Sequence, residues 1–221
     1  MTHAAHPDRK ALARIGAAVR ERLAGEPAVR RLVDERAEIY AVEQFLPLPA
    51  CARIMALIDA VACPSSLIDG GAWPDYRTSY SGDIDACDTS VRDLETRLAA
   101  ITGIAAACGE SAQGQRYRCG EYFHEHCDWF DTAARYWGRE RRCGGQRSWT
   151  AMVYLNTVED GGTTDFTRIA LSVPPRAGAL LLWNNALPDG TPNPWTMHAA
   201  RPVRQGVKYV VTKWFRTRIC Q

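Results

Sequence analysis

The N-terminal segment carries apolar residues at helical spacing. Four of them recur at i, i+3, i+7 and i+11, namely Leu12, Ile15, Val19 and Leu23. This stripe predicts an amphipathic helix, and Asp8, just before it, is expected to cap its N-terminus. The segment 25–27 (Gly-Glu-Pro) ends the pattern, and Val29, Leu32 and Val33 after it predict a short second helix. We expect these helices to pack on the main domain; the alternative is that they bind a partner.

Further along, helix-like and strand-like segments alternate with breaks. The segment 39–46 (Ile-Tyr-Ala-Val-Glu-Gln-Phe-Leu) predicts a strand, and residues 49–62 predict a helix. Residues 64–90 are rich in Pro, Gly, Asp and Ser and are expected to form irregular loops. A helix is predicted over 91–104, because four apolar residues share one of its faces: Val91, Leu94, Leu98 and Ile101.

In the second half of the chain, short apolar runs are separated by turn-forming residues. The three runs are Trp149–Leu155, Ala179–Trp183 and Val207–Phe215. Strands of this length and spacing favour a β-sandwich or barrel, and helices followed by strands indicate an α+β chain. We therefore expect an N-terminal helical extension over 1–38 and one domain over 39–221. Within that domain, about 39–111 would be the helical part and about 112–218 the β core.

Composition places the chain among ordinary globular proteins. Its 221 residues are 46% hydrophobic and 24% charged, and 27 basic against 25 acidic side chains leave a net charge of +2. This balance gives no general reason to expect nucleic-acid binding, and no apolar run is long enough to predict a transmembrane helix. The first 35 residues lack the continuous apolar stretch of a signal peptide. Because none of the eight Cys has C-x-x-C spacing, we expect mostly free thiols and a reducing, cytoplasmic location.

The segment 124–128 (His-Glu-His-Cys-Asp) points to a metal site. On a strand, residues two apart face the same way, so His126 and Asp128 would present an imidazole and a carboxylate together. Beyond position 126 the sequence has one more histidine, His198. Two histidines and one carboxylate form the facial triad of non-haem Fe(II) oxygenases, which leaves metal positions open for other ligands. An H-x-D pair alone is a weak signal, since such pairs are more often surface hydrogen bonds.

The last apolar run supplies an independent indication. Its alternating pattern places four residues on one face of a strand, namely Lys208, Val210, Thr212 and Trp214. A lysine among apolar neighbours is costly unless its ammonium group finds an anion. An acidic cosubstrate that chelates the metal at one end and meets Lys208 at the other would supply that anion. The alternative is an edge strand whose lysine points to solvent.

Several segments, in this order, resemble a known enzyme family. They are R-Y-x-x-G and H-x-D-[YWF]-F within 116–130, G-G-Q-R-x-x-T within 144–156, E-x-G-G-x-T-x-F within 159–166 and H-x-x-x-P-V-x-x-G-x-K within 198–208. From about Ile39 to Arg218, the chain resembles the 2-oxoglutarate- and Fe(II)-dependent dioxygenases, and among them the prolyl 4-hydroxylase catalytic subunits. The resemblance implies a double-stranded β-helix, which is a cupin-like jelly-roll of two facing sheets, with supporting N-terminal helices.

The resemblance also implies roles for individual positions. The iron ligands would be His126, Asp128 and His198. The residues that bind 2-oxoglutarate would be Lys208, Tyr117 and Thr164. Arg147 and Trp214 would lie near a peptide substrate. The implied reaction is hydroxylation of an unactivated C–H bond, first of all in a prolyl residue of a peptide or protein, with succinate and CO2 as coproducts. Its cofactors would be Fe(II), 2-oxoglutarate and O2, with ascorbate as a candidate reductant. The alternatives are the same chemistry on a small molecule, such as a free amino acid or a natural-product precursor, and a catalytically silent module that binds a metal or a partner.

Two segments depart from the family pattern. The stretch after Ser79 is more acidic than the family leads us to expect, in a region where substrate-binding loops lie. Residues 135–147 hold five arginines against one acid, Glu140. We interpret this basic run either as a solvated loop or as a surface that attracts an acidic peptide or a small anionic substrate.

Residues beside the expected ligands also need an interpretation. Asp128 is present, so the halogenase variant of the family, which lacks this carboxylate, has no support. His124 is expected to point outward or to pack beyond the metal. Cys127 lies between two ligands and is expected to face away from the metal as a core residue.

Overall fold

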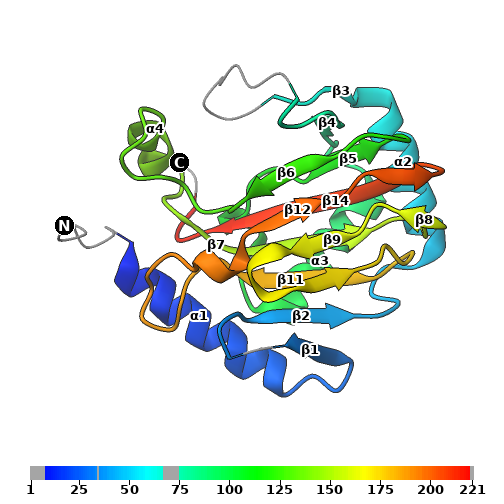
Figure 1. Ribbon diagram of the computed structural model, residues 1–221. Coiled ribbons are helices and arrows are strands. Elements are labelled where there is room, and N and C mark those ends of the chain that lie inside the picture. Colours follow the sequence, from blue (N-terminus) through cyan, green and yellow to red (C-terminus); the bar gives the residue numbers. More distant parts are fainter. Residues whose placement is uncertain (1–7, 34, 67–74, 220–221) are drawn as a thin grey trace.

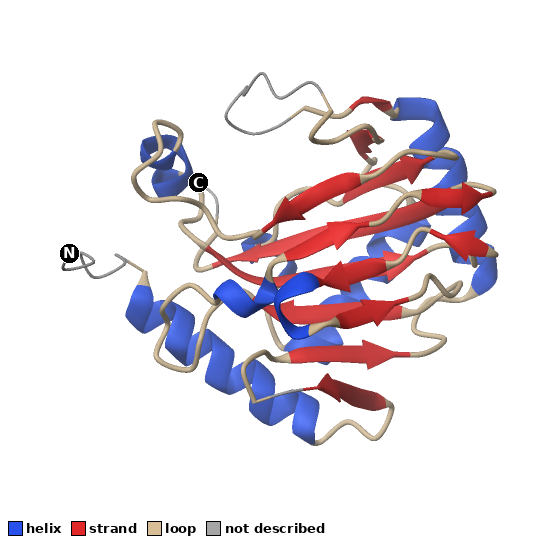
Figure 2. Cartoon of the chain, in the orientation of Figure 1, coloured by secondary structure: helices blue, strands red, loops and turns tan. Residues whose placement is uncertain are grey.

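Two antiparallel sheets face each other in the computed structural model, which describes residues 8–33, 35–66 and 75–219 (Figures 1 and 2). The large sheet has eight strands in the order β1-β2-β11-β7-β14-β5-β4-β3. In chain order, their bounds are β1 (Val29–Val33), β2 (Ile39–Val42), β3 (Cys63–Pro64), β4 (Tyr80–Asp83), β5 (Gln113–Tyr117), β7 (Arg147–Tyr154), β11 (Leu180–Asn184) and β14 (Lys208–Arg216).

The small sheet has four strands in the order β10-β9-β12-β6. These strands are β6 (Phe123–His126), β9 (Thr164–Phe166), β10 (Leu171–Val173) and β12 (His198–Ala200). A separate two-stranded ladder joins β8 (Asp160–Gly161) to β13 (Val203–Gln205). Two facing antiparallel sheets of this kind form a jelly-roll, as the sequence predicts.

Three helices cover the face of the large sheet that points away from the small sheet. They are α1 (Arg9–Ala24), α2 (Leu48–Val61) and α3 (Thr89–Thr102), and their apolar faces share one buried cluster with the large sheet. A fourth, short helix, α4 (Trp137–Arg142), projects beside one end of the sheets (Figure 1). Three single-turn 3-10 segments complete the helical structure of the described residues: Ala106–Cys108, Thr167–Ile169 and Pro194–Thr196.

Strand β7 shows how the sequence separates two buried cores. Trp149, Ala151 and Val153 belong to the core beneath the helices, whereas Met152 and Tyr154 belong to the core between the two sheets. Successive side chains of a strand point to opposite faces, so a strand covered on both faces needs apolar residues at nearly every position. This requirement explains the continuous apolar run from which the strand is predicted.

The three predicted long helices are present with small changes in their bounds. The start of α1 differs from expectation, because the Asp8 side chain makes no capping hydrogen bond. Its carboxylate instead accepts hydrogen bonds from the backbone N–H of Gln146 at 2.8 Å and from the guanidinium of Arg218 at 3.0 Å. The residue before α1 is thus tied to segments much later in the chain.

Two expectations about local structure are wrong. The short helix predicted from Val29 is strand β1, which pairs with β2 in register Val29↔Val42. So short a segment is a poor helix on its own, and the sheet edge satisfies its backbone hydrogen bonds. The predicted loop region 64–90 contains β4, which pairs with β5 and extends the large sheet, and it also includes the start of α3. Residues 67–74 of that region lie outside the described residues.

The cysteines largely agree with the predicted free thiols. Six described cysteines are free: Cys51, Cys63, Cys87, Cys108, Cys119 and Cys127. Cys143 is disulfide-bonded. No helix among the described residues combines the length and the apolar character needed to cross a membrane.

Candidate active site

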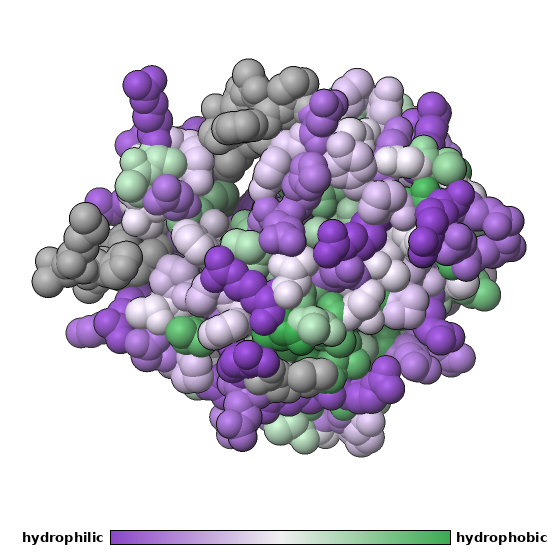
Figure 3. All heavy atoms as spheres, viewed as in Figure 1, coloured by the Kyte–Doolittle hydropathy of each residue, from purple (hydrophilic) through white to green (hydrophobic). Residues whose placement is uncertain are grey.

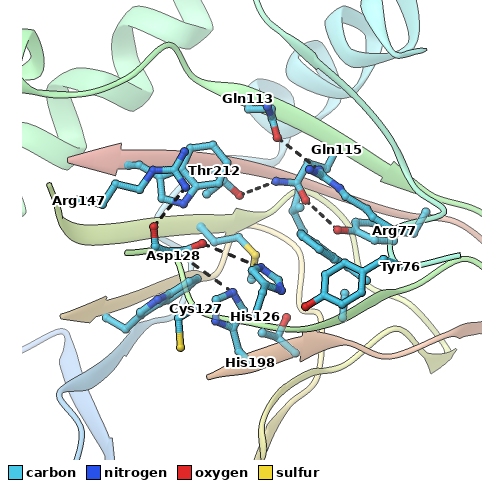
Figure 4. A pocket seen from close by; sticks show the side chains of 18 of the residues that line it. Tyr76, Arg77, Gln113, Gln115, His126, Cys127, Asp128, Arg147, His198 and Thr212 are labelled. Carbon is cyan, nitrogen blue, oxygen red and sulfur yellow. Dashed lines mark hydrogen bonds and ion pairs between the residues drawn. The ribbon is translucent and has the colours of Figure 1, made fainter. Parts of the chain in front are cut away.

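A cavity of about 900 Å³ opens between the two sheets (Figure 4). Its walls come from β5, β7, β11 and β14 of the large sheet and from β6, β9 and β12 of the small sheet. The volume is typical of a ligand-binding pocket. All eight residues predicted to bind metal, cosubstrate or substrate line it: Tyr117, His126, Asp128, Arg147, Thr164, His198, Lys208 and Trp214.

His126, Asp128 and His198 converge at one place in this cavity. Strand β6 ends at His126 and β12 begins at His198, and the two residues are direct partners in the antiparallel pairing. Asp128 follows β6 by two residues. The Nε2 atoms of His126 and His198 each lie 4.0 Å from an Asp128 carboxylate oxygen, and the potential ligand atoms all lie within 4.8 Å of one another.

Hydrogen bonds orient these three side chains. The Nδ1 atom of His126 lies 2.8 Å from the carbonyl oxygen of His124, and Nδ1 of His198 lies 2.9 Å from the carbonyl oxygen of Thr196. Each Nε2 is therefore left to face Asp128. The hydroxyl of Thr150 donates to Asp128 Oδ2 at 2.7 Å and accepts from the Asn185 amide at 2.9 Å. Metal-binding histidines and carboxylates usually have such a supporting shell.

The protonation states favour metal binding. Burial, together with the neighbouring His198, lowers the pKa of His126, so its imidazole is neutral near pH 7. Burial alone would raise the pKa of Asp128, but His198, His126 and Arg147 outweigh it, and the net effect is a lowered pKa. A neutral imidazole and an ionised carboxylate are the forms that ligate a metal ion. Two histidines and one carboxylate match the non-haem Fe(II) facial triad.

Lys208 is a buried amine for which the described residues supply no counter-ion. Its side chain is about 1% exposed, and its Nζ lies over the rings of Tyr117 and Tyr154 at 5.3 and 5.5 Å. Its hydrogen bond to Thr164 Oγ1 is long, at 3.4 Å. Within the described part of the chain it forms no ion pair, and burial lowers its pKa to about 7. A buried ammonium group that no described carboxylate neutralises has the chemistry to bind an anion.

Tyr117 and Thr164 lie beside Lys208 as the sequence predicts. Tyr117 pairs with Lys208 across β5 and β14, and its hydroxyl donates to Gln115 Oε1 at 2.8 Å. Burial raises the pKa of Tyr117, so the phenol stays protonated and able to donate. Thr164 is buried on β9 and accepts a 2.8 Å hydrogen bond from the hydroxyl of Tyr154. The three polar side chains therefore form one end of the cavity.

Arg147 and Trp214 lie together near Asp128. The guanidinium carbon of Arg147 lies 4.2 Å from the centre of a Trp214 ring. Two hydrogen bonds of 2.7 Å join Arg147 to Glu110, which also forms a 2.8 Å ion pair with the buried Arg216. Burial would raise the pKa of Glu110, but the two arginines outweigh it and lower that pKa. Glu110 precedes the strand-rich region and belongs to no recognisable pattern, so sequence reasoning missed it.

Arg77 is a further cavity residue that the sequence analysis did not single out. It donates hydrogen bonds to Ser79 Oγ at 3.0 Å and to Gln113 Oε1 at 3.3 Å, and its guanidinium lies over the ring of Phe123. No described carboxylate forms an ion pair with it, and burial lowers its pKa. Its only signal in the sequence is its place in the Arg-Thr-Ser segment at 77–79, directly before the acidic stretch.

The residues between the ligands differ in part from expectation. His124 is exposed, as predicted, and its ring lies 4.9 Å from that of Tyr122. Cys127 was expected to be a core residue facing away from the metal, yet it is only half-buried and borders the cavity. The chain leaves strand β6 after His126, so strict alternation no longer applies at the next residue.

Known proteins share sequence with this chain over much of its length. A sequence model of the 2OG-Fe(II) oxygenase superfamily matches residues 112–216. The chain is 30% identical over 205 residues to "Probable prolyl 4-hydroxylase 3" of Arabidopsis thaliana, and the alignment covers 82% of this chain and 69% of that protein. It is 32% identical over 144 residues to prolyl 4-hydroxylase subunit alpha-2 of Gallus gallus, which covers 65% of this chain and 26% of that protein.

Solved structures share its fold. A viral collagen prolyl hydroxylase from Paramecium Bursaria Chlorella virus-1, solved as its 2OG complex, superposes with a TM-score of 0.63 at 24% identity, covering 80% of this chain and 95% of that chain. A prolyl hydroxylase from Trichoplax adhaerens, solved with a hypoxia inducible factor peptide fragment, also gives 0.63, at 14% identity over 98% of this chain and 94% of that chain. These likenesses confirm the predicted double-stranded β-helix.

Proposed function

Because the chain belongs to the prolyl 4-hydroxylase-like group of the 2-oxoglutarate- and Fe(II)-dependent oxygenases, we propose that it hydroxylates a prolyl residue of a peptide or protein. Membership makes the chain an enzyme whose cofactors are Fe(II), 2-oxoglutarate and O2, with succinate and CO2 as coproducts. The observation that carries the proposal is that one cavity holds both a two-histidine, one-carboxylate cluster and a buried lysine that forms no ion pair with a described residue. Ascorbate as a reductant stays a prediction.

His126, Asp128 and His198 would hold the iron. Their side chains offer one ligand atom each, and backbone carbonyls and Thr150 fix which atoms face inward. Three protein ligands leave further coordination positions for other groups. Fe(II) bound there would activate O2, which is the oxidant, while 2-oxoglutarate would be the co-reductant that is oxidised to succinate and CO2 as the C–H bond is hydroxylated.

Lys208, Tyr117 and Thr164 would bind the carboxylate of 2-oxoglutarate that is far from the metal. Lys208 supplies the charge, and its burial makes an arriving carboxylate strongly favoured, because each charge compensates the other in a site without water. The phenol of Tyr117 and the hydroxyl of Thr164 can turn toward the same oxygen atoms by exchanging their present partners. All three residues are almost fully buried, so solvent has little access to this end of the cavity.

Arg147 and Trp214 would contact the peptide. Glu110 and the flat Trp214 ring hold the Arg147 guanidinium in place, so its remaining N–H groups are pre-positioned for a peptide carbonyl. Aromatic rings are also the usual contact for proline-rich segments, which enter binding sites already extended. The position of these two residues near Asp128 would place the bound prolyl ring close to the metal.

Two measurements test the proposal. Anaerobic addition of Fe(II) and 2-oxoglutarate to the protein should give a visible charge-transfer band, and Asp128→Ala should lose it while keeping the circular dichroism of the folded protein. Proline-rich peptides should then stimulate succinate release. A well-folded protein that shows neither the band nor peptide-stimulated turnover contradicts the proposal.

The second candidate is the same chemistry on a small molecule. The half-buried Arg77 in the cavity wall, which forms no ion pair with a described carboxylate, favours it, since a free carboxylate of a small substrate could bind there. Parallel succinate assays with proline-rich peptides, free amino acids and other small carboxylates distinguish the two. Stimulation by small molecules alone would replace the peptide as substrate without changing the reaction.

We also propose a cytoplasmic location. The six free thiols support it, and the disulfide at Cys143 counts against it. Thiol titration of the protein isolated without reductant should find those six thiols. Full oxidation of the isolated protein would oppose this location.

A further inference from the structure

The basic run noted in the sequence forms a distinct surface around α4. Four of its arginines, which we call the α4 patch, are Arg135, Arg139, Arg141 and Arg142. All four side chains are exposed. Figure 3 shows strongly hydrophilic side chains projecting in the region of α4, at the upper left.

Most of the positive charge of the α4 patch is not neutralised. Arg139 forms a 2.8 Å ion pair with Glu140, but Glu140 is also bound at 2.8 Å by the buried Arg216. The other three patch arginines form no ion pair with any described residue. The nearby carboxylate of Asp131 accepts a hydrogen bond from the backbone N–H of Ala133, within its own turn. The surface thus presents a surplus of guanidinium groups.

The helix that carries the patch is firmly held. Trp137 and Glu140 are buried on its inner side, and Arg216 bonds both to the Glu140 carboxylate and to the carbonyl of Cys143. The carbonyl of Arg141 accepts a hydrogen bond from the Arg218 side chain. Because the backbone is fixed from below, the arginines project from a rigid base.

The patch continues directly into the candidate active site. Tyr136 lies between Arg135 and α4, and it lines the cavity. Its ring packs edge-on against Phe130 at 6.0 Å, and the Arg147 guanidinium lies 4.6 Å from the centre of the Phe130 ring. A chain that leaves the cavity past Tyr136 therefore meets the α4 patch first.

We propose that the α4 patch docks an acidic segment of the polypeptide substrate, next to the prolyl residue that occupies the cavity. This inference rests on the proposed function. A polypeptide fits better than a nucleic acid, because the patch is confined to one short helix and the preceding turn, whereas nucleic-acid surfaces follow the phosphates over a longer distance. Three arginines on one rigid helix, with a fourth in the turn before it, suit a short run of carboxylates.

The size of the effect follows from exposed ion pairs. Each exposed pair contributes little, but three to four together should lower KM about tenfold at low salt. The value of kcat should not change, since no patch residue reaches the metal ligands. Added salt should remove the effect, because it shortens the Debye length and thereby screens the exposed charges from one another.

The test compares a proline-rich peptide with the same peptide extended by four glutamates. KM and kcat are measured at 25 and 500 mM NaCl for the wild type and for the variant R135Q/R141Q/R142Q. The matched control is R14Q/R92Q/R176Q, which removes the same charge from exposed arginines that form no ion pair with a described residue. We expect the glutamate extension to lower KM about tenfold in the wild type and in the control, and hardly at all in the patch variant.

A second measurement separates docking from catalysis. A fluorescein-labelled tetraglutamate peptide without proline should bind the wild type and the control, and bind the patch variant several-fold more weakly, by fluorescence anisotropy. If no peptide is turned over but this binding is seen, the proposal of a prolyl substrate is wrong, and the proposal that the α4 patch binds an acidic segment is supported. Equal KM for both peptides in the wild type, an acidic preference retained in the patch variant, or tighter binding of a single-stranded oligonucleotide of equal charge would overturn the docking proposal.

Discussion

The buried Lys208 predicts that 2-oxoglutarate binding depends on pH in a way that few surface lysines could produce. Its pKa is lowered from 10.5 to about 7 by burial. A carboxylate binds the ammonium form and not the neutral amine, whereas the carboxylates of 2-oxoglutarate stay ionised throughout the neutral range. Raising the pH through 7 therefore removes the binding-competent form of the free enzyme.

The magnitude follows from this lowered pKa. With a pKa of about 7, roughly nine-tenths of Lys208 is protonated at pH 6 and roughly one-tenth at pH 8. The dissociation constant of 2-oxoglutarate should therefore rise about tenfold between these two values. At pH 8, each binding event should also take up about 0.9 proton, because the bound carboxylate restores the charge on Lys208.

Isothermal titration of the anaerobic Fe(II) enzyme in two buffers of different ionisation enthalpy measures both quantities. Lys208→Arg is the matched control, since a guanidinium remains charged throughout this range. That variant should bind 2-oxoglutarate with little pH dependence and take up no proton. An equally steep pH dependence in the arginine variant, or none in the wild type, would refute the assignment of Lys208 as the titrating group.

Three other changes test the site. In the absence of 2-oxoglutarate, Lys208→Met should stabilise the protein by up to about 5 kcal/mol below pH 7. Between the folded pKa and 10.5 the unfolded wild type binds more protons than the folded wild type, so the wild type loses stability as the pH falls through this range, and the methionine variant does not. The same variant should also lose the rise in Tm that 2-oxoglutarate produces. Thr150→Val should weaken Fe(II) binding about 10- to 100-fold in an anaerobic titration, whereas Thr150→Ser, which keeps the bond to Asp128, should not. Glu110→Gln should raise the peptide KM more than it lowers kcat, and reduce the free energy of unfolding in urea by about 3 kcal/mol, because Arg147 and the buried Arg216 lose the charge of their shared, half-buried partner.

The metal site was predictable from sequence because its information is local. His126 and Asp128 are two residues apart at the end of a strand, and the scarcity of histidine leaves His198 as the partner. Lys208 was predictable for a similar reason, since a charge on the apolar face of a strand contradicts its surroundings. The family resemblance then supplied Tyr117 and its role.

The remaining features depend on contacts between distant segments. Glu110 has no pattern of its own and gains a role only when the fold places it beside Arg147 and Arg216. Strand β1 was predicted as a helix, because an apolar run this short fits both periods until a neighbouring strand is known. Cys127 differs from expectation because the strand ends one residue before it. In each case the missing quantity is the position of another part of the chain.

Strand β14 has a consequence for how the protein is made on the ribosome. It lies between β7 and β5 in the middle of the large sheet, although it follows every other described strand in the sequence. Until β14 emerges, β7 and β5 each present an unpaired edge, which is the usual starting point for aggregation during synthesis. The nascent chain would thus hold its three candidate iron ligands before its sheet can close, and closure of that sheet would deliver Lys208. We therefore expect the nascent chain to depend most on chaperones while β14 is still inside the ribosomal exit tunnel.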